Sequence, residues 1–336
     1  MLTVDAEAIL AFRLRAGHLD ARLGAGAASV RDAVHAGAQD SMPRAAVLSL
    51  HARVEDVTTR VLDDPVLTQV WGPGFSAYVV AAADVATFTL GRYPDRGRRR
   101  TTADRLSARL ADVLDAQPRE YRDVGTELGV DPNQLRYAAL TGTIRLHWAG
   151  AGKPKISRLP APDIDPLDAR CELARRFLHV YGPATVEDFA TWAGVTLDHG
   201  RTAFDGIESE TIAVTIPIGE ARLLAVDEER LCASAKPVVS TRLLPSGDAF
   251  TLWTGEQRRL LVDDAERRSQ LWTPRVWPGA VLIDGRIGGT WRRAANRLTI
   301  DLWEPSADDV MERLEAEAAS LPLVEQPLVV SFSSME

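Results

Sequence analysis

One order of elements recurs three times along this chain of 336 residues and limits its fold more than any other feature. Each time, apolar residues at helical spacing lead through a turn into a short pair of β-prone segments. The first repeat places helices near 4–16, 27–36 and 41–54 before a hairpin at 66–84. Helix–turn–helix units that end in a β-ribbon are winged helices, so the pattern predicts three of them.

The second repeat has clear turn and capping residues. A helix at 102–117 leads into helix, turn, helix and strand over 119–148. Gly129 supplies the turn, Asp131 caps the following helix and Pro132 takes its first position. The next segment, 148–168, is rich in Gly and Pro and is expected to be a linker.

The third repeat occupies 169–207. Thr185 is expected to cap a helix whose first turn carries Glu187 and Asp188, and Gly194 marks the turn before the next helix. After about residue 211 the pattern changes to short alternating strands, and a charged helix near 306–320 follows.

These patterns together predict an α+β protein with three tandem winged helices and a β-rich C-terminal domain. The expected boundaries are 1–92, 93–160, 161–210 and 211–336.

Composition excludes several classes of protein. No apolar run approaches the ~20 residues of a membrane helix, and the N-terminus resembles neither a secretory signal nor a transit peptide. Cys171 and Cys232 stand alone, so we expect reduced thiols, a cytoplasmic protein and no bound metal. The glycines at 285–290 fit a hairpin turn better than a nucleotide cradle, and no cofactor is expected.

The net charge is −8, which by itself argues against a protein that binds nucleic acid, but the charge is unevenly distributed along the chain. Acidic and basic residues balance over 1–150, and the acidic excess lies in the remainder. Arg98, Arg99 and Arg100 belong to the strongest local run of positive charge. Such a run is either a solvated loop or an edge that binds DNA phosphates.

Gln39 and Asp40 precede an apolar helical pattern, with Pro43 shortly after them. One interpretation is capping: Asp40 or Ser41 accepts backbone amides, and Pro43 sits in the first helical turn. The other is that a helix terminus holds the Gln39 amide at a reactive surface. Asp248, within Leu-Leu-Pro-Ser-Gly-Asp, fits a structural carboxylate better than a catalytic one.

The order of several motifs resembles one family, the winged-helix DNA glycosylases of the AlkZ and YcaQ kind. The motifs are Tyr-Gly-Pro-Ala-Thr at 181–185, Leu-Leu-Pro at 243–245, Gly-Thr-Trp-Arg-Arg at 289–293 and the segment 36–54. The resemblance implies three winged helices on a β-rich scaffold and a bacterial, nucleoid-associated enzyme. It also implies excision of alkylated bases, including bulky antibiotic adducts and interstrand crosslinks.

Active members of that family carry Gln-x-Gln or Gln-x-Asp where this chain has Gly-Ala-Gln-Asp. The resemblance therefore makes Gln39 a catalytic candidate, with Asp40 beside it, but puts Gly37 where the first Gln belongs. A cationic N7-alkylated purine leaves without an acid, so an amide that orients water can suffice. If the missing amide limits activity, Gly37→Gln is expected to raise it.

Further residues are expected to contact DNA. The family's first hairpin faces DNA with cations, and this chain keeps its Trp while departing from its Arg and His positions. The candidates are Gln69, Trp71 and Tyr78 on the hairpin, Asn133, Gln134 and Arg136 near a helix start, and Trp291, Arg292 and Arg293 on a strand.

Two functions remain open at this stage. The first is a monomeric glycosylase that excises N7-adducted purines from double-stranded DNA, with a possible part in antibiotic self-resistance. The second is a winged-helix DNA-binding protein without chemistry, either a regulator or a protein that shields damage.

Overall fold

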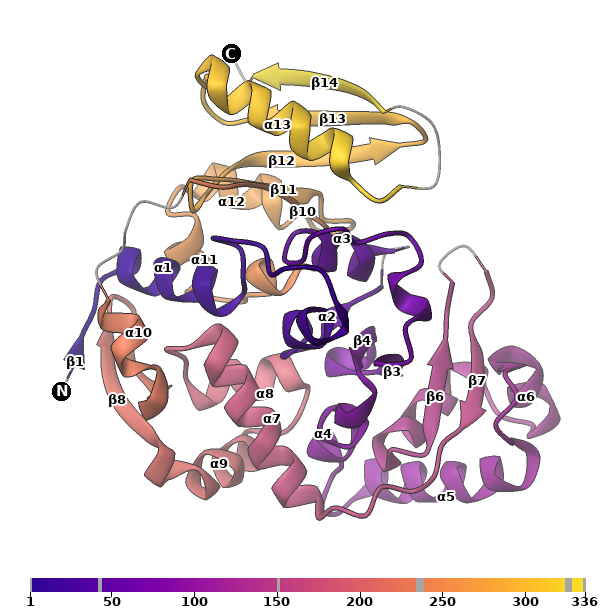
Figure 1. The fold of residues 1–336 in the computed structure, drawn as a ribbon. Helices are drawn as coiled ribbons and strands as arrows, with labels where there is room; N and C mark the ends of the chain where they lie inside the picture. The colour runs from indigo at the N-terminus through magenta and orange to yellow at the C-terminus, as the bar shows by residue number, and fades with distance from the viewer. Residues whose placement is uncertain (1, 42–43, 150–151, 234–238, 324–327, 335–336) are drawn as a thin grey trace.

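The computed structural model describes residues 2–41, 44–149, 152–233, 239–323 and 328–334. These residues form a mixed α+β structure with three sheets, as the sequence predicted at the level of fold class. Figure 1 shows the five-stranded sheet at one end of the molecule and the helices of the first 230 residues at the other.

The N-terminal segment builds the side of the molecule that carries the catalytic candidates. Its elements are α1 (Ala6–Ala16), α2 (Ala27–Ala33), β2 (Ala38–Gln39), α3 (Ala45–His51), β3 (Leu67–Trp71), β4 (Ala77–Ala81) and α4 (Val85–Thr89). The hairpin β3–β4 forms as predicted, and Gly74 adopts φ +62° in its turn. The third helix, expected at 41–54, begins later, at Ala45, and the short strand β2, which pairs with β4, lies before it. Pro43 lies outside the described residues.

The second segment extends the same sheet. It contains α5 (Arg98–Val113), β5 (Arg119–Glu120), α6 (Tyr121–Glu127), a long 3₁₀ helix (Pro132–Thr141), β6 (Ile144–His147) and β7 (Lys155–Arg158). The six strands run in the order β2-β4-β3-β6-β7-β5. The linker expected at 148–168 was wrong in part, because it contains β7, which pairs with β6.

The third segment has its own small sheet. The helices are α7 (Pro166–Tyr181), α8 (Val186–Ala193) and α9 (Leu197–Gly206), followed by β8 (Thr211–Ile216) and β9 (Gly219–Leu224). The capping box of Thr185 and Asp188 and the left-handed Gly194 confirm the predicted helix limits. The strand β1 (Leu2–Thr3) pairs in parallel with β8, so β8 and β9 do not join the C-terminal sheet.

The C-terminal segment is less rich in strands than expected. It contains α10 (Glu228–Cys232), β10 (Thr241–Leu244), α11 (Gln257–Leu261), α12 (Ala265–Leu271), β11 (Gly279–Ile283), β12 (Arg286–Ala294), β13 (Arg297–Leu302), α13 (Asp308–Ser320) and β14 (Val329–Ser334). Among the residues expected to form short alternating strands after residue 211, Gln257–Leu261 form helix α11 and Ala249–Thr251 form a 3₁₀ turn. Side-chain packing overrides β-propensity here, because Leu260 and Leu261 are buried on one face of a short helix.

Further short 3₁₀ turns occur at Val61–Asp63, Pro73–Phe75, Ala82–Asp84, Leu90–Arg92, Glu208–Glu210 and Ala225–Asp227. In the described part of the chain, no helix is both long and apolar enough to cross a membrane. Cys171 and Cys232 are free thiols. Within the same residues, His, Cys, Asp and Glu form no group of three or more that could hold a metal ion.

Candidate active site

Gln39 lies in the short strand β2, where it is paired with Tyr78 of β4. Its side chain lines a cavity of about 170 Å³. The amide nitrogen donates a hydrogen bond of 3.1 Å to the Ser41 hydroxyl, and the amide also lies against Gly247. The strand replaces the helix terminus expected from the sequence, but Gln39 does reach a concave surface.

The other walls of this cavity are mostly aromatic. Trp192 comes from α8, Trp253 from the loop after β10, and Trp277 from the segment before β11. Asp188 from α8 is the carboxylate among the described residues that line it. Flat rings beside a negative charge suit a positively charged heteroaromatic ligand.

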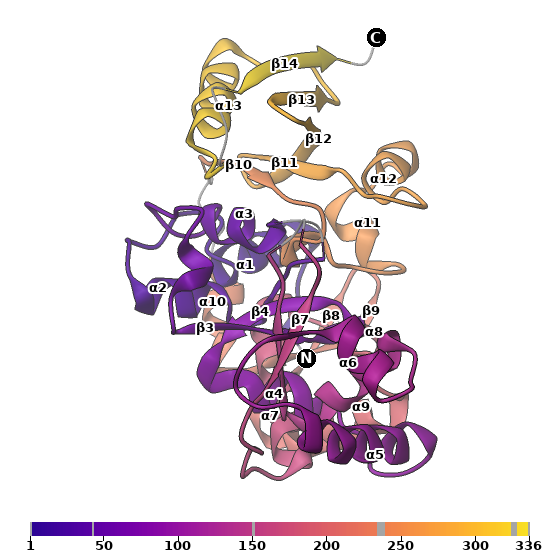
Figure 2. The ribbon, with the colours of Figure 1, turned by 90° about the vertical axis from the view of Figure 1, so that its right-hand side faces the viewer.

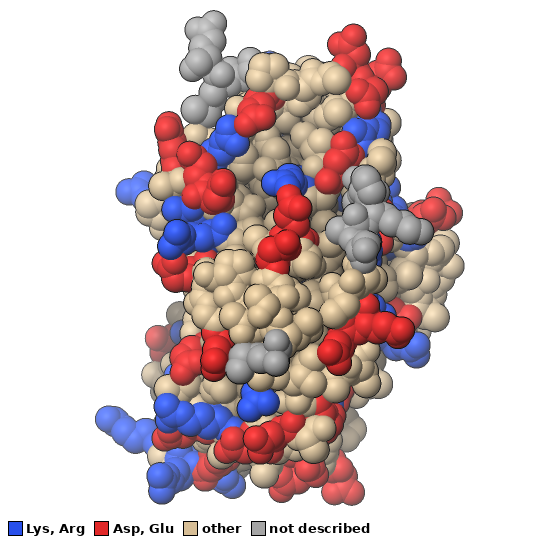
Figure 3. Space-filling model, turned by 90° about the vertical axis from the view of Figure 1, so that its left-hand side faces the viewer, with Lys and Arg blue, Asp and Glu red and all other residues tan. Residues whose placement is uncertain are grey.

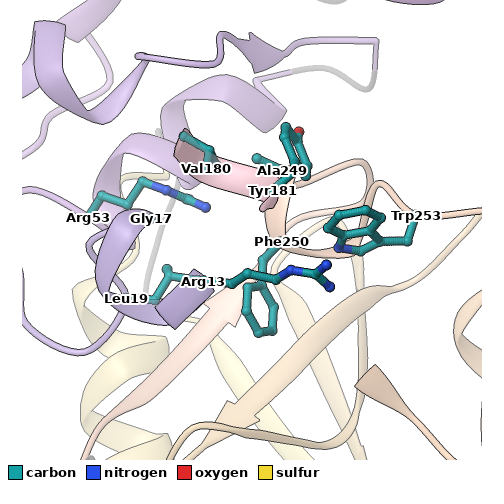
Figure 4. Close-up of a pocket in the computed structure, with 9 residues that line it drawn as sticks. All are labelled: Arg13, Gly17, Leu19, Arg53, Val180, Tyr181, Ala249, Phe250 and Trp253. Carbon is teal, nitrogen blue, oxygen red and sulfur yellow. The ribbon is translucent and has the colours of Figure 1, made fainter. Parts of the chain in front are cut away.

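A buried network supports the Trp253 wall from behind (Figure 4). The Arg13 guanidinium stacks over Trp253 at 3.9 Å from the ring centre. It donates to the Gln257 amide oxygen at 2.9 Å, and the Gln257 nitrogen donates to Asp188 Oδ2, also at 2.9 Å. Burial lowers the pKa of Arg13 to about 9, against the opposing effect of Asp188, so Arg13 stays charged at neutral pH.

Asp188 has one oxygen committed to this network. Its Oδ2 accepts from the Thr185 backbone amide, the Thr185 hydroxyl and Gln257. These bonds fix the carboxylate at the cavity wall. The sequence marked Asp188 only as a first-turn acid, because Arg13 and Gln257 lie far from it along the chain and give no local signal.

Asp40 faces the opposite side of β2 from Gln39, as neighbouring residues of a strand do. It is 2% exposed, and it accepts bonds from the Ala46 amide at 3.1 Å and from Gln69 Nε2 at 2.9 Å. The capping interpretation therefore holds for Asp40, which satisfies an amide at the start of α3. Burial raises the pKa of Asp40 to about 6, although the Ala46 amide, Arg44 and Gln69 counteract it.

Gly37 has no space for the side chain that the family places there. Its φ is +72°, and a Cβ would lie 2.9 Å from Tyr78 Cδ1 and 3.0 Å from Phe88 Cε1. The ring of Tyr78 therefore fills the region beside Gly37. This geometry argues against the expectation that Gly37→Gln raises activity.

Three residues expected to contact DNA are turned inward. Tyr78 is 2% exposed, and Trp291 is 6% exposed with its Nε1 donating to the Leu244 carbonyl. The Gln69 amide is fully engaged, since Nε2 donates to Asp40 and the Trp148 carbonyl while Oε1 accepts from the Trp148 amide. Trp291 is thus enclosed by protein. The ring of Tyr78 lines the Gln39 cavity, and the half-buried Gln69 lines a second concave surface, so these two residues hold strands together at the edges of concavities.

The other expected DNA contacts remain at the surface. Arg98 and Arg99 are exposed at the start of α5, whereas Arg100 is half-buried and pairs with Asp104 at 3.7 Å. Outward-facing positions are also held by Trp71, which is half-buried, by Asn133, Gln134 and Arg136 around the 3₁₀ helix, and by Arg292 and Arg293 on β12.

A positively charged groove was missed by the sequence analysis. It has a volume of about 560 Å³, and its lining comes mainly from the β6–β7 hairpin and the segment that joins α3 to β3. The ribbons of these two parts of the chain can be followed in Figures 1 and 2. Arg44, Arg145, Lys153 and Lys155 line the groove, against Asp63 and Glu120. Its cations are spread over more than a hundred residues, so no run of charge reveals them.

The opposite side of the molecule looks different. Figure 3 shows Lys and Arg mixed with Asp and Glu over this face, with uncharged surface across its middle.

The crowding at Gly37 predicts a loss of stability on substitution. Gly37→Ala should lower the free energy of unfolding by more than ~1 kcal/mol, because the new Cβ meets two rings at a positive φ. Gly24→Ala is the matched control, since nothing lies within 4 Å of its Cβ position. Urea denaturation measures both. A Gly37→Gln protein of unchanged stability would contradict the steric argument.

Asp40 predicts a dependence of stability on pH. Its folded pKa, about 6, lies above the ordinary value of 3.8, so the folded state binds the proton more tightly. The stabilisation is complete below pH ~4 and is lost as pH rises through 6. The advantage of Asp40→Asn over the parent should therefore grow from pH 4 to 7 by at most ~3 kcal/mol. Urea denaturation across this range that gives a constant difference would refute the raised pKa.

Comparisons with known proteins agree with these features. The family model described as DNA glycosylase AlkZ-like matches residues 30–322. A curated relative from Streptomyces sahachiroi, named interstrand DNA cross-link repair glycosylase, is 25% identical over 244 residues, which span 64% of each chain and thus just under two thirds of the relative. The solved structure of Streptomyces sahachiroi DNA glycosylase AlkZ superposes with a TM-score of 0.80 at 20% identity, over 99% of this chain and 100% of that one. Because the family model covers most of the sequence, the chain belongs to the AlkZ-like DNA glycosylase family.

Proposed function

We propose that this protein is a DNA glycosylase that excises N7-alkylated purines by hydrolysing the N-glycosidic bond. The observation that carries the proposal is the Gln39 amide at the wall of an aromatic cavity that also presents Asp188. Family membership supports the reaction class. The name of the Streptomyces relative, which refers to interstrand DNA crosslinks, supports a crosslinked purine among the substrates. A bulky adduct of a DNA-alkylating antibiotic is the further substrate that the sequence resemblance implies.

In the proposed reaction, the bond between C1′ and the purine nitrogen breaks, and its electron pair neutralises the cationic base. Water adds to C1′ and releases one proton, so no group has to protonate the leaving base. Gln39 Nε2 donates to Ser41, which fixes the amide plane and leaves Oε1 free to accept a hydrogen bond from that water. Asp188 and the tryptophan rings favour positive charge in the cavity.

Asp40 acts in this proposal as a positioning residue and not as a general base. Its two oxygens bind Ala46 and Gln69 on the far side of β2 from the cavity. It holds the end of β2 against α3, and so fixes where the backbone of Gln39 lies.

The alternative is a DNA-binding protein that has lost the chemistry. The specific observation that favours it is the pair Gly37 and Tyr78, because an aromatic ring fills the place of the family's first amide. A cavity with one amide can still orient one water, so we prefer the enzyme.

We further infer that the three groups of helices and hairpins act as winged helices. The hairpins would be β3–β4, β6–β7 and β8–β9. The third unit then extends to about residue 224, beyond the boundary expected at 210, since Ala184 and Arg222 are bridged. The five-stranded sheet would be the C-terminal scaffold.

The basic groove supplies a test of DNA binding. Replacing Arg145, Lys153 and Lys155 by Ala should weaken binding similarly for all duplex sequences, because phosphates carry no sequence information. The slope of log affinity against log salt should flatten by about 2–3. The parallel variant replaces Arg98, Arg99 and Arg100. If only the groove variant changes the slope, the arginine run is a solvated surface; if neither does, DNA binds elsewhere.

The reaction itself is tested at Gln39. Gln39→Ala should slow release of 7-methylguanine from duplex DNA by ~10²-fold or more, the effect of losing a positioning group. Gln117→Ala is the control, because that exposed amide lies outside the cavity and outside the expected DNA contacts. Abasic sites are measured by alkaline cleavage. Parent protein that binds the alkylated duplex but leaves it intact would overturn the glycosylase proposal and support the binding protein.

A further inference from the structure

A second aromatic cavity lies beside the Gln39 cavity, between the turn of β3–β4 and the β6–β7 hairpin. Its volume is about 280 Å³. Four half-buried rings from separate parts of the chain line it, namely Trp71, Phe75, Tyr121 and Trp148. We call it the hairpin pocket.

The rings are not explained by core packing alone. Trp71, Tyr121 and Trp148 touch the edge of the core around β6, but each keeps part of its surface in the hairpin pocket. Trp71 and Tyr121 meet edge to face at 6.5 Å. The Trp148 ring is tethered by a bond from Nε1 to the Gly152 carbonyl. The pocket is thus held open by oriented rings and offers faces for stacking.

Three arginine side chains lie near the ring of Phe75 at the rim of the hairpin pocket. The backbone of Phe75 has φ +58°, which is uncommon for a bulky residue. The guanidinium groups of Arg92, Arg99 and Arg136 lie 4.9, 5.7 and 5.7 Å from its ring. Arg136 lines the pocket, and its Nε is buried without a hydrogen-bond partner among the described atoms.

The chemistry of the lining selects an anionic aromatic ligand. The residues that line the pocket within the described chain include Arg136 and the amide of Asn133, and none is Asp or Glu. An acidic or neutral peptide would use the cation as well, but four ring faces match a nucleobase and its phosphate more closely.

The hairpin pocket connects the two sites already described. Ser76 lines both it and the Gln39 cavity, and Ser41, which accepts from Gln39, lines it too. On its other side, Leu146 and Trp148 are shared with the basic groove. The three concavities therefore form one continuous path along the six-stranded sheet.

From this continuity we propose that the hairpin pocket receives a second, unpaired nucleobase of the DNA whose target base enters the Gln39 cavity. Extracting the target breaks stacking and pairing around it. The rings of Tyr121 and Trp148 recover stacking for the displaced neighbour. Arg136 binds its phosphate, and the strand continues onto Arg145 and Lys155. The inference rests on the proposed function, because that function identifies the target base. Its test measures DNA binding and does not require base excision.

The test uses undamaged DNA, so that binding is separated from chemistry. Fluorescence anisotropy compares a fully paired duplex with the same duplex carrying one unpaired adenine. Tyr121→Leu combined with Trp148→Leu should weaken binding of the bulged duplex roughly 10-fold, and of the paired duplex less than about twofold. Trp303→Leu is the matched control, as a half-buried Trp in the C-terminal segment away from the pocket. Equal losses for both duplexes, or no loss, would overturn the proposal.

A second variant keeps the test decisive if the double variant is unstable. Arg136→Gln removes the positive charge but keeps a polar side chain, and it should reduce the salt slope of bulged-duplex binding by about 1. In the parent protein, 2-aminopurine at the unpaired position should change its fluorescence on binding, and Tyr121→Leu alone should diminish that change. Unaltered slope and fluorescence would exclude the pocket. Base release that persists while bulge discrimination fails would remove this inference and leave the glycosylase intact. A protein that still discriminates the bulged duplex but releases no base would support this inference and remove the glycosylase proposal.

Discussion

Arg53 and Asp248 form a buried, two-point ion pair on which the geometry of the Gln39 cavity depends. Arg53 NH1 and NH2 donate to the two carboxylate oxygens at 2.7 and 2.8 Å, and Ser49 and the Phe250 amide complete the shell. Burial would raise the pKa of Asp248, but Arg53 and these donors hold it below its usual range. Removing one partner of such a pair costs about 3–5 kcal/mol, because the other charge stays buried.

The pair joins two segments that are 195 residues apart. Ser49 lies on α3, and Arg53 lies shortly after the end of that helix. The helix itself follows β2, the strand that carries Gln39. Asp248 opens the 3₁₀ turn that leads to Trp253, and Gly247 packs against the Gln39 amide. The aromatic wall and the amide of the cavity are therefore fixed relative to each other by one interaction outside the cavity. The structural role inferred for Asp248 from sequence is confirmed by its contacts.

The sequence predicted those features that depend on residues close together in the chain, such as helix caps and turns. Thr185 directly precedes the helix that it caps, so its role could be predicted, as could the turns at Gly129 and Gly194. The cavity could not be predicted in the same way. Trp192, Trp253 and Trp277 come from three separate elements, and only tertiary packing brings them to Gln39.

The exposure of a strand residue could not be predicted from the sequence where protein covers both faces of the strand. Every residue of β4 is buried, so Tyr78 faces protein although its position suggested a DNA contact. Trp291 is buried for a related reason, since β12 lies between β11 and β13 and its ring reaches the Leu244 carbonyl. The groove was missed because charge was summed along the chain. The pairing of β6 with β7 brings Arg145 close to Lys155, and Arg44 reaches the same groove from the segment before α3.

The close contact between Gly37 and the Tyr78 ring affects how a cavity with a single amide can catalyse the proposed reaction. Without the first amide the cavity has one hydrogen-bonding group fewer, but the Tyr78 ring lies beside Gly37 and lines the cavity, so apolar rings surround the Gln39 amide. Hydrogen bonds and charges act more strongly in such a site, because less water competes for them. The remaining amide then orients water under drier conditions, and Asp188 is the carboxylate that the cavity offers to a cation. On this argument the substrate must bring its own positive charge, which is the property that makes an N7-alkylated purine leave without an acid.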